Sequence, residues 1–180
     1  GFDVAAWCRE RLVDVLTLGS RSSEVDVAAF RRIAPAGSVR LQPCFDDHHT
    51  TDGYRYAPIE VLRGVFANWW QQGADSVATF NWSNAPPDAC RAVGALPGPL
   101  THRQAYHEIG SPKTMEFKDK TFVVERRGGY PWAEGFFNRN DTAPLPLQLP
   151  PDGTPATIRV RISDDLATHA ARVKSILLRA

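Results

Sequence analysis

The chain has 180 residues, enough for one ordinary domain or for one domain and part of another. Its apolar fraction of 43% and charged fraction of 23% are typical of a globular protein and exclude a disordered chain. The net charge is +1 with both signs interspersed, which argues against nucleic acid or an anionic membrane as the main partner. No run of about 18 apolar residues occurs, so we expect no membrane span.

Two alternating patterns fill the chain up to residue 82. Apolar residues at helical spacing predict helices at 3–11, 25–33 and 59–72. Runs rich in Val, Leu and Phe predict buried strands at 12–19, 39–45 and 74–82. Ser22 or Ser23 is expected to cap the second helix, and Gly73 to end the third. The alternation predicts an α/β fold with a parallel sheet.

The first and third predicted strands share a local pattern. Residues 13–20 (VDVLTLGS) align with 74–83 (ADSVATFNWS), so Asp14 and Asp75 hold equivalent places where the strands begin. Strand beginnings in βα folds serve stability, whereas chemistry lies at the strand ends. Both aspartates are therefore interpreted as structural.

The pattern changes after a short predicted helix at 101–109, which residues 110–112 end. Strand-like runs then alternate with Gly-Gly, Pro-rich and Asp-Gly turns, at 121–126, 145–149, 157–162 and 173–178. These runs predict an antiparallel β domain. We therefore expect two domains, 1–112 and 113–180, in a chain that is truncated at both ends.

The stretch 39–49 (VRLQPCFDDHH) joins a strand to four ionisable side chains, Asp46, Asp47, His48 and His49. Strand ends in α/β proteins commonly face a ligand pocket. Alternation along the strands predicts that one side of the sheet is the more polar, with Thr17, Gln42, Cys44, Thr79 and Asn81. It predicts an apolar side formed by Leu16, Leu18, Leu41, Phe45 and Phe80. The polar side suits a ligand.

The three cysteines, Cys8, Cys44 and Cys90, are far apart and lack CxxC spacing. This pattern predicts neither a disulfide framework nor a zinc site. Cys8 falls on a predicted helix and Cys44 in a predicted strand, which favours buried free thiols. A nucleophilic Cys44 beside His48 or His49 stays open as an alternative.

Three stretches together resemble a known family: LQPCFDDHHTTDGY at 41–54, ADSVATFNWS at 74–83, and EIGSP at 108–112 leading to RRGGYPWAEGFFNRN at 126–140. They are similar to the last third of bacterial glycoside-hydrolase-like (β/α)8 barrel proteins, the family 10-like group, with the β domain that follows the barrel. The resemblance covers most of the chain. It implies the last three βα units of a (β/α)8 (TIM) barrel followed by an incomplete antiparallel β domain, and by itself suggests a secreted or periplasmic protein.

The resemblance implies a hydrolase that cleaves O-glycosidic bonds of a polysaccharide or oligosaccharide with paired carboxylates, and with no cofactor or metal. Asp46 or Asp47 would act as nucleophile or base, although related barrels usually carry glutamate there, and the partner acid lies outside this chain. The carbohydrate would be bound by His48, His49, Tyr54, Asn81, Trp82 and Gln42.

Two other functions stay open. The first is a non-catalytic carbohydrate-binding or cell-surface protein on a degenerate barrel. The second is a metal-dependent hydrolase that uses Asp46, Asp47, His48 and His49. Adjacent histidines lack the usual zinc spacing. The aspartates also suit loop capping, and Trp82 also suits ordinary packing. The sequence leaves the oligomeric state open.

Overall fold

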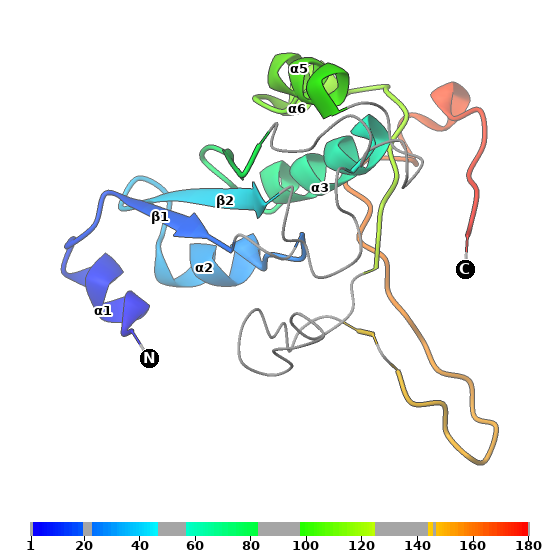
Figure 1. Cartoon of the computed structure of the whole chain (residues 1–180). Coiled ribbons are helices and arrows are strands. Elements are labelled where there is room, and N and C mark those ends of the chain that lie inside the picture. The colour runs from blue at the N-terminus through cyan, green and yellow to red at the C-terminus, as the bar shows by residue number, and fades with distance from the viewer. Residues whose placement is uncertain are drawn as a thin grey trace.

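The computed structural model describes residues 2–19, 23–46, 57–82, 98–124, 144–145 and 147–179, without the side chains of 98–100. In this part of the chain three strands form one parallel sheet in the order β1-β2-β3 (Figure 1). The strands are β1 (Val15–Leu18), β2 (Arg40–Asp46) and β3 (Ala78–Phe80). The helices are α1 (Val4–Arg9), α2 (Val27–Ile33), α3 (Ile59–Gln71), α5 (Gly98–Glu108), α6 (Pro112–Met115) and the 3-10 helix η1 (Ala170–Arg172). The predicted parallel pairing is confirmed, although each outer strand is shorter than expected.

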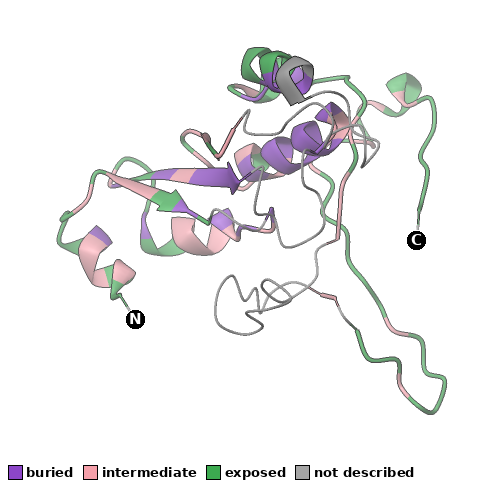
Figure 2. Cartoon of the chain, viewed as in Figure 1, coloured by how far each residue is buried: buried purple, intermediate pink, exposed green. Residues whose placement is uncertain are grey.

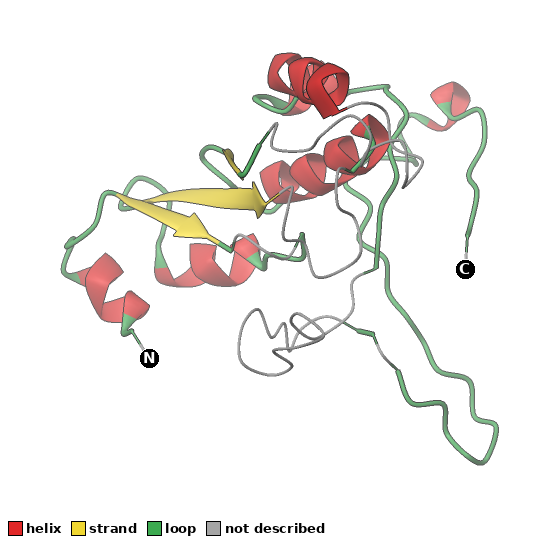
Figure 3. Cartoon of the chain, viewed as in Figure 1, coloured by secondary structure: helices red, strands yellow, loops and turns green. Residues whose placement is uncertain are grey.

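The predicted barrel units and antiparallel β domain are wrong. The described residues form a small α/β domain whose single sheet has three strands, all parallel. No strand occurs within four of the segments that were predicted as strands, which all run as loop (Figure 3): 121–124, 147–149, 157–162 and 173–178. The 3-10 helix η1 lies just before the last of them. Alternation in a segment such as 157–162 favours extended backbone, but a strand also requires a neighbour to complete its hydrogen-bonded ladder. The predicted division at residue 112 stays a prediction.

The core lies between the sheet and helices α2 and α3. Phe45 of β2 packs against Phe66 and Trp69 of α3, with ring centroids 6.1 and 6.5 Å apart. Helix α2 meets the C-terminal end of α3, where the backbone N–H of Ala28 donates to Gln72 Oε1 at 3.4 Å. The two crossovers between consecutive parallel strands run through these helices, with α2 between β1 and β2 and α3 between β2 and β3. Most of β2 and α3 is therefore buried (Figure 2).

A capping aspartate begins α2, and a glycine ends α3. Asp26 caps α2 by accepting from the backbone N–H of Ala29 at 2.8 Å, so the predicted Ser22 or Ser23 cap is wrong. Gly73 ends α3 with a φ of +95°, as expected for a residue that follows a helix.

Asp75 has the structural role predicted for it. Its Oδ2 accepts from the backbone N–H of Leu41 at 2.8 Å and from Arg31 Nη2 at 2.5 Å. Burial raises the pKa of the Asp75 carboxyl, but hydrogen bonds from Arg31 and Leu41 outweigh it and hold the pKa below its ordinary value. Asp75 thus joins α2 to β2 at the point where the chain leads into β3. The backbone carbonyl of Asp14 accepts from the N–H of Arg40 at 2.9 Å at the equivalent place.

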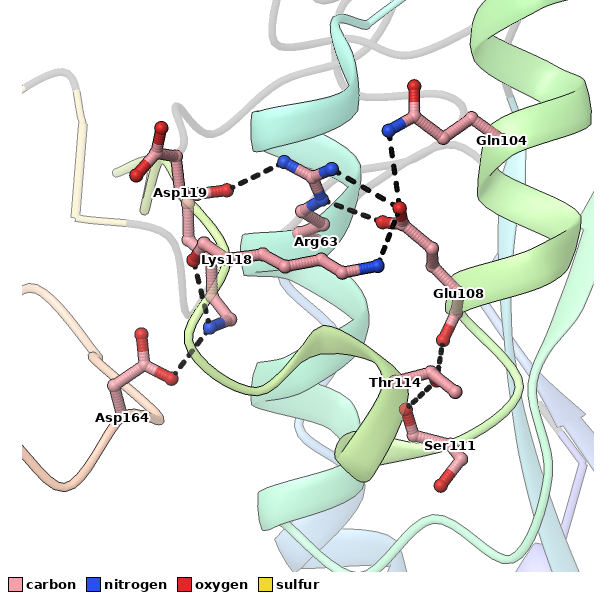
Figure 4. A network of polar contacts seen from close by, with 9 residues as sticks. Arg63, Gln104, Glu108, Ser111, Thr114, Lys118, Asp119 and Asp164 are labelled. Atoms are coloured by element: carbon pink, nitrogen blue, oxygen red, sulfur yellow. Dashed lines mark hydrogen bonds and ion pairs between the residues drawn. The ribbon is translucent and has the colours of Figure 1, made fainter.

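A buried ion pair joins α3 to α5 (Figure 4). Arg63 Nε and Nη2 donate to the two carboxylate oxygens of Glu108 at 2.7 and 3.3 Å, and the two side chains are only 9% and 7% exposed. Lys118 Nζ lies 2.8 Å from Glu108 Oε1, and Arg63 Nη1 donates to the carbonyl of Asp119 at 3.2 Å. We call this set the Arg63–Glu108 clamp. It holds α3, α5 and the segment 118–119 together.

The segment that follows α6 crosses α3 at Gly64. The backbone N–H of Thr121 donates to the carbonyl of Glu60 at 2.8 Å, one turn before Gly64. A Cβ atom at position 64 would collide with the carbonyl oxygen of Thr121 and lie 2.9 Å from its carbonyl carbon. Only glycine allows the two backbones to approach this closely.

Gly64→Ala is therefore expected to destabilise the protein by at least about 1–3 kcal/mol, because backbone atoms have to shift to relieve the collision. Gly110→Ala is the matched control, since a Cβ there meets no atom within 4 Å. Urea unfolding of both variants measures the difference. Equal unfolding midpoints for the two variants would contradict the close approach at Gly64.

The clamp also predicts how stability depends on pH. Burial raises the pKa of Glu108, but hydrogen bonds from Arg63, Lys118 and Gln104 outweigh it and lower the pKa from 4.5 to about 2. A carboxyl whose pKa is depressed by folding stabilises the protein above its unfolded pKa and loses that contribution as pH falls. The contribution of Glu108 is therefore complete above pH 4.5 and disappears as pH falls toward 2.

Glu108→Gln should destabilise the protein at pH 7 by about 3–5 kcal/mol, because Arg63 keeps a buried charge without its carboxylate partner. Thermal unfolding of wild type and variant between pH 2.5 and 7 measures the effect, and the gap between the two should narrow below about pH 4.5. A gap that stays constant over this range would refute the assigned role of Glu108.

Candidate functional site

Asp46 is the predicted catalytic residue that lies within the described part of the chain. It is the last residue of the central strand β2, and its side chain is buried, with the residue 1% exposed. The carboxyl ends of neighbouring parallel strands meet at this edge of the sheet. An aspartate is rarely buried to this extent unless its carboxylate has a polar partner.

Asn81 reaches Asp46 from the end of β3. Its Nδ2 donates to Asp46 Oδ1 at 3.0 Å. The backbone of Asn81 has a φ of +51°, the left-handed conformation that asparagine tolerates better than most residues. This single residue ends the alternation of the strand and turns its amide toward the neighbouring carboxylate.

The register of β3 differs from the prediction by one residue. Phe80 pairs with Asp46, and Thr79 pairs with Phe45, so Phe80 lies on the side of the sheet that carries Asp46. The predicted placement of Thr79 with the polar side, and of Phe80 with the apolar side, is therefore wrong. A shift of one residue exchanges every side chain between the two faces of a strand. Asn81 still joins the polar side, because its left-handed backbone departs from the strand pattern.

Gln42 lies further back on the same side of β2. Thr17 Oγ1 donates to Gln42 Oε1 at 3.2 Å, and Gln42 Nε2 donates to Ser76 Oγ at 3.1 Å. The side chain thus bridges β1 to the residues that lead into β3. These contacts favour a scaffold role over direct contact with a ligand.

Trp82 is held among aromatic side chains. Its ring centroid lies 6.3 Å from Phe45, 4.4 Å from His102 and 5.9 Å from Tyr106. The Trp82 and Phe45 rings meet edge to face, at 88°. This geometry favours the packing alternative for Trp82 over a free platform for a sugar ring.

His102 and Tyr106 were missed by sequence reasoning. They occupy the same face of α5 because four residues separate them, and His102 is only 2% exposed. The available signal was this helical spacing in a segment that follows Trp82 in the chain. Nothing in the sequence alone states which strand end the helix packs against.

Cys44 does not support nucleophilic chemistry. It is buried, and desolvation, with the nearby Asp46 charge, raises the pKa of its thiol to about 11. The reactive thiolate is therefore scarce at neutral pH. Cys8 is also a buried free thiol, as predicted, whereas Cys90 lies outside the described residues.

Four predicted site residues lie outside the described residues, namely Asp47, His48, His49 and Tyr54. Among the residues that are described, no three His, Cys, Asp or Glu side chains gather in a way that could hold a metal ion. Over the same part of the chain, no helix has the length and apolar character needed to cross a membrane.

Comparison with protein-family models finds no match for the chain, and no curated protein sequence matches it significantly. The resemblance to glycoside-hydrolase-like proteins therefore rests on the three sequence stretches alone. The residues near Asp46 provide an independent basis for a functional hypothesis.

Two substitutions test the conformation of Asn81. Asn81→Gly and Asn81→Ala both remove the amide that donates to Asp46, but only alanine adds the cost of a left-handed backbone, about 1 kcal/mol or more. Asn81→Ala should therefore be less stable than Asn81→Gly by about that amount in urea unfolding. Equal stability, or a more stable alanine variant, would contradict the left-handed turn.

Proposed function

We propose that the protein hydrolyses glycosidic bonds of a polysaccharide or oligosaccharide, with Asp46 as nucleophile or base. The observation that carries the proposal is the buried carboxyl of Asp46 at the end of the central strand, oriented by Asn81 at 3.0 Å. A reacting carboxylate has to be held in one orientation, and the hydrogen bond from the half-buried amide of Asn81 supports this.

Glycoside hydrolysis needs two carboxyl groups, one to protonate the leaving oxygen and one to attack the sugar or activate water. Asp46 supplies one of them in this proposal, and Asp47 is the alternative at the adjacent position. Neither a metal nor a cofactor is required by this chemistry.

The proposed carbohydrate contacts fall into two groups. His48, His49 and Tyr54 are proposed to bind sugar hydroxyls or stack on the ring. Asn81 and Gln42 hydrogen-bond to other side chains, and Trp82 packs against aromatic rings, which supports a role in shaping the site. Substrate recognition is therefore assigned mainly to the residues that follow Asp46.

Asp46→Asn tests the proposal. An asparagine amide can rotate so that its oxygen still accepts from Asn81, so the local fold should survive while the carboxylate is lost. We expect kcat on a responsive carbohydrate, found by measuring released reducing ends across a panel of glycans, to fall roughly 10²–10⁴-fold. The dissociation constant for that carbohydrate should change little.

Asp3→Asn is the matched control, because Asp3 caps α1 by accepting from the N–H of Ala6 at 2.8 Å and asparagine caps equally well. Turnover that survives both Asp46→Asn and Asp47→Asn would refute the assigned nucleophile. Carbohydrate binding by wild type without any turnover would support the carbohydrate-binding alternative. Stoichiometric metal in the active protein would support the metal-dependent alternative.

A further inference from the structure

Helix α5 packs against the residue that follows Asn81. His102 packs against Trp82 in a tilted arrangement, with ring centroids 4.4 Å apart and planes 42° apart, and Tyr106 meets the same ring one turn later. Phe45, the residue before Asp46, packs against Trp82 as well, at 6.3 Å. Trp82 is therefore held between α5 and the end of β2.

These contacts form two connections from α5 to Asp46. In one, His102 contacts Trp82, which is bonded to Asn81, and Asn81 donates to Asp46. In the other, Trp82 contacts Phe45, which is bonded to Asp46. His102 thus contacts Trp82, the residue after Asn81, directly, and it reaches Phe45, the residue before Asp46, through the Trp82 ring.

The backbone of Asn81 explains why this packing matters. A left-handed residue persists only where its surroundings over-determine the conformation. The amide of Asn81 reaches Asp46 because of that conformation, with a φ of +51°. The ring of Trp82, fixed by its aromatic neighbours, restrains the peptide that follows Asn81.

We infer that His102 is a positioning residue, which holds Trp82 and thereby fixes the left-handed turn at Asn81 and the orientation of Asp46. His102 touches no reacting group in this arrangement, and its part in turnover rests on the proposed function of Asp46. Loss of its ring opens space beside Trp82, so Trp82 relaxes and the amide of Asn81 moves away from the carboxylate. A displacement of about 1 Å at a reacting group can cost roughly 10²-fold in rate.

Three variants of α5 test the inference. His102→Ala removes the ring, His102→Phe keeps a planar ring against Trp82, and His107→Ala removes an exposed histidine from the same helix as a control. The first readout needs no substrate and is a double-mutant cycle with Asn81→Gly, followed by urea unfolding. We expect Asn81→Gly to shift the unfolding midpoint less in the His102→Ala background than in wild type. In the His107→Ala background the two shifts should add.

The second readout is turnover of a carbohydrate substrate. His102→Ala should lower kcat by roughly 10-fold to 10²-fold while KM stays within a few-fold, because it misplaces the reacting carboxylate without removing a substrate contact. His102→Phe should restore most of kcat, and His107→Ala should match wild type. Measurements are made well below the unfolding temperature of each variant, so that global destabilisation does not mimic the effect.

Additive shifts in the His102–Asn81 cycle would overturn the inference, whatever the substrate turns out to be. Equal losses of kcat in His102→Phe and His102→Ala would also overturn it, because ring packing would then not be the operative contact. Coupling in the cycle without turnover of any glycan by wild type supports the positioning of Asp46 and refutes the proposed hydrolysis. The two hypotheses therefore fail in distinguishable ways.

Discussion

The ion pair between Arg63 and Glu108 fixes the position of α5 on α3. Arg63 donates to both carboxylate oxygens of Glu108, and the pair excludes most water. Such a pair adds little net stability compared with apolar packing, but breaking it leaves a buried charge without a partner. The two hydrogen bonds orient the two side chains relative to each other and so favour this placement of α5 along α3. Trp70 adds a second directional contact at the same end of α5, because its Nε1 donates to the carbonyl of Ile109 at 2.8 Å.

That placement extends to the end of the sheet. With Glu108 fixed near its C-terminal end, α5 brings His102 and Tyr106 against Trp82. Trp82 follows the left-handed residue whose amide orients Asp46. A helix that comes after the sheet in the chain therefore shapes the orientation of a carboxylate on the central strand. The ion pair between Arg63 and Glu108 positions α5, and the aromatic contacts of α5 in turn position Trp82.

Sequence patterns predicted what local periodicity determines and missed what tertiary contacts determine. The three parallel strands and Asp75 followed from apolar runs and from the repeated aspartate at the strand beginnings. The segment 157–162 has an equally clear alternation, yet Ile158, Val160 and Ile162 are 43%, 41% and 39% exposed and form no ladder in the described structure. Alternation reports which residues share a side of an extended chain. It does not report whether a partner strand is present.

The candidate site shows the same division. The position of Asp46 could be predicted, because it needs only the end of an apolar strand. The roles of Asn81 and Trp82 could not, because they depend on one backbone torsion and on rings contributed by α5. An asparagine after a strand is as compatible with a sugar contact as with a carboxylate partner, until its φ is known. Once that torsion is left-handed, the amide faces Asp46. Asn81 then supports the carboxylate of Asp46.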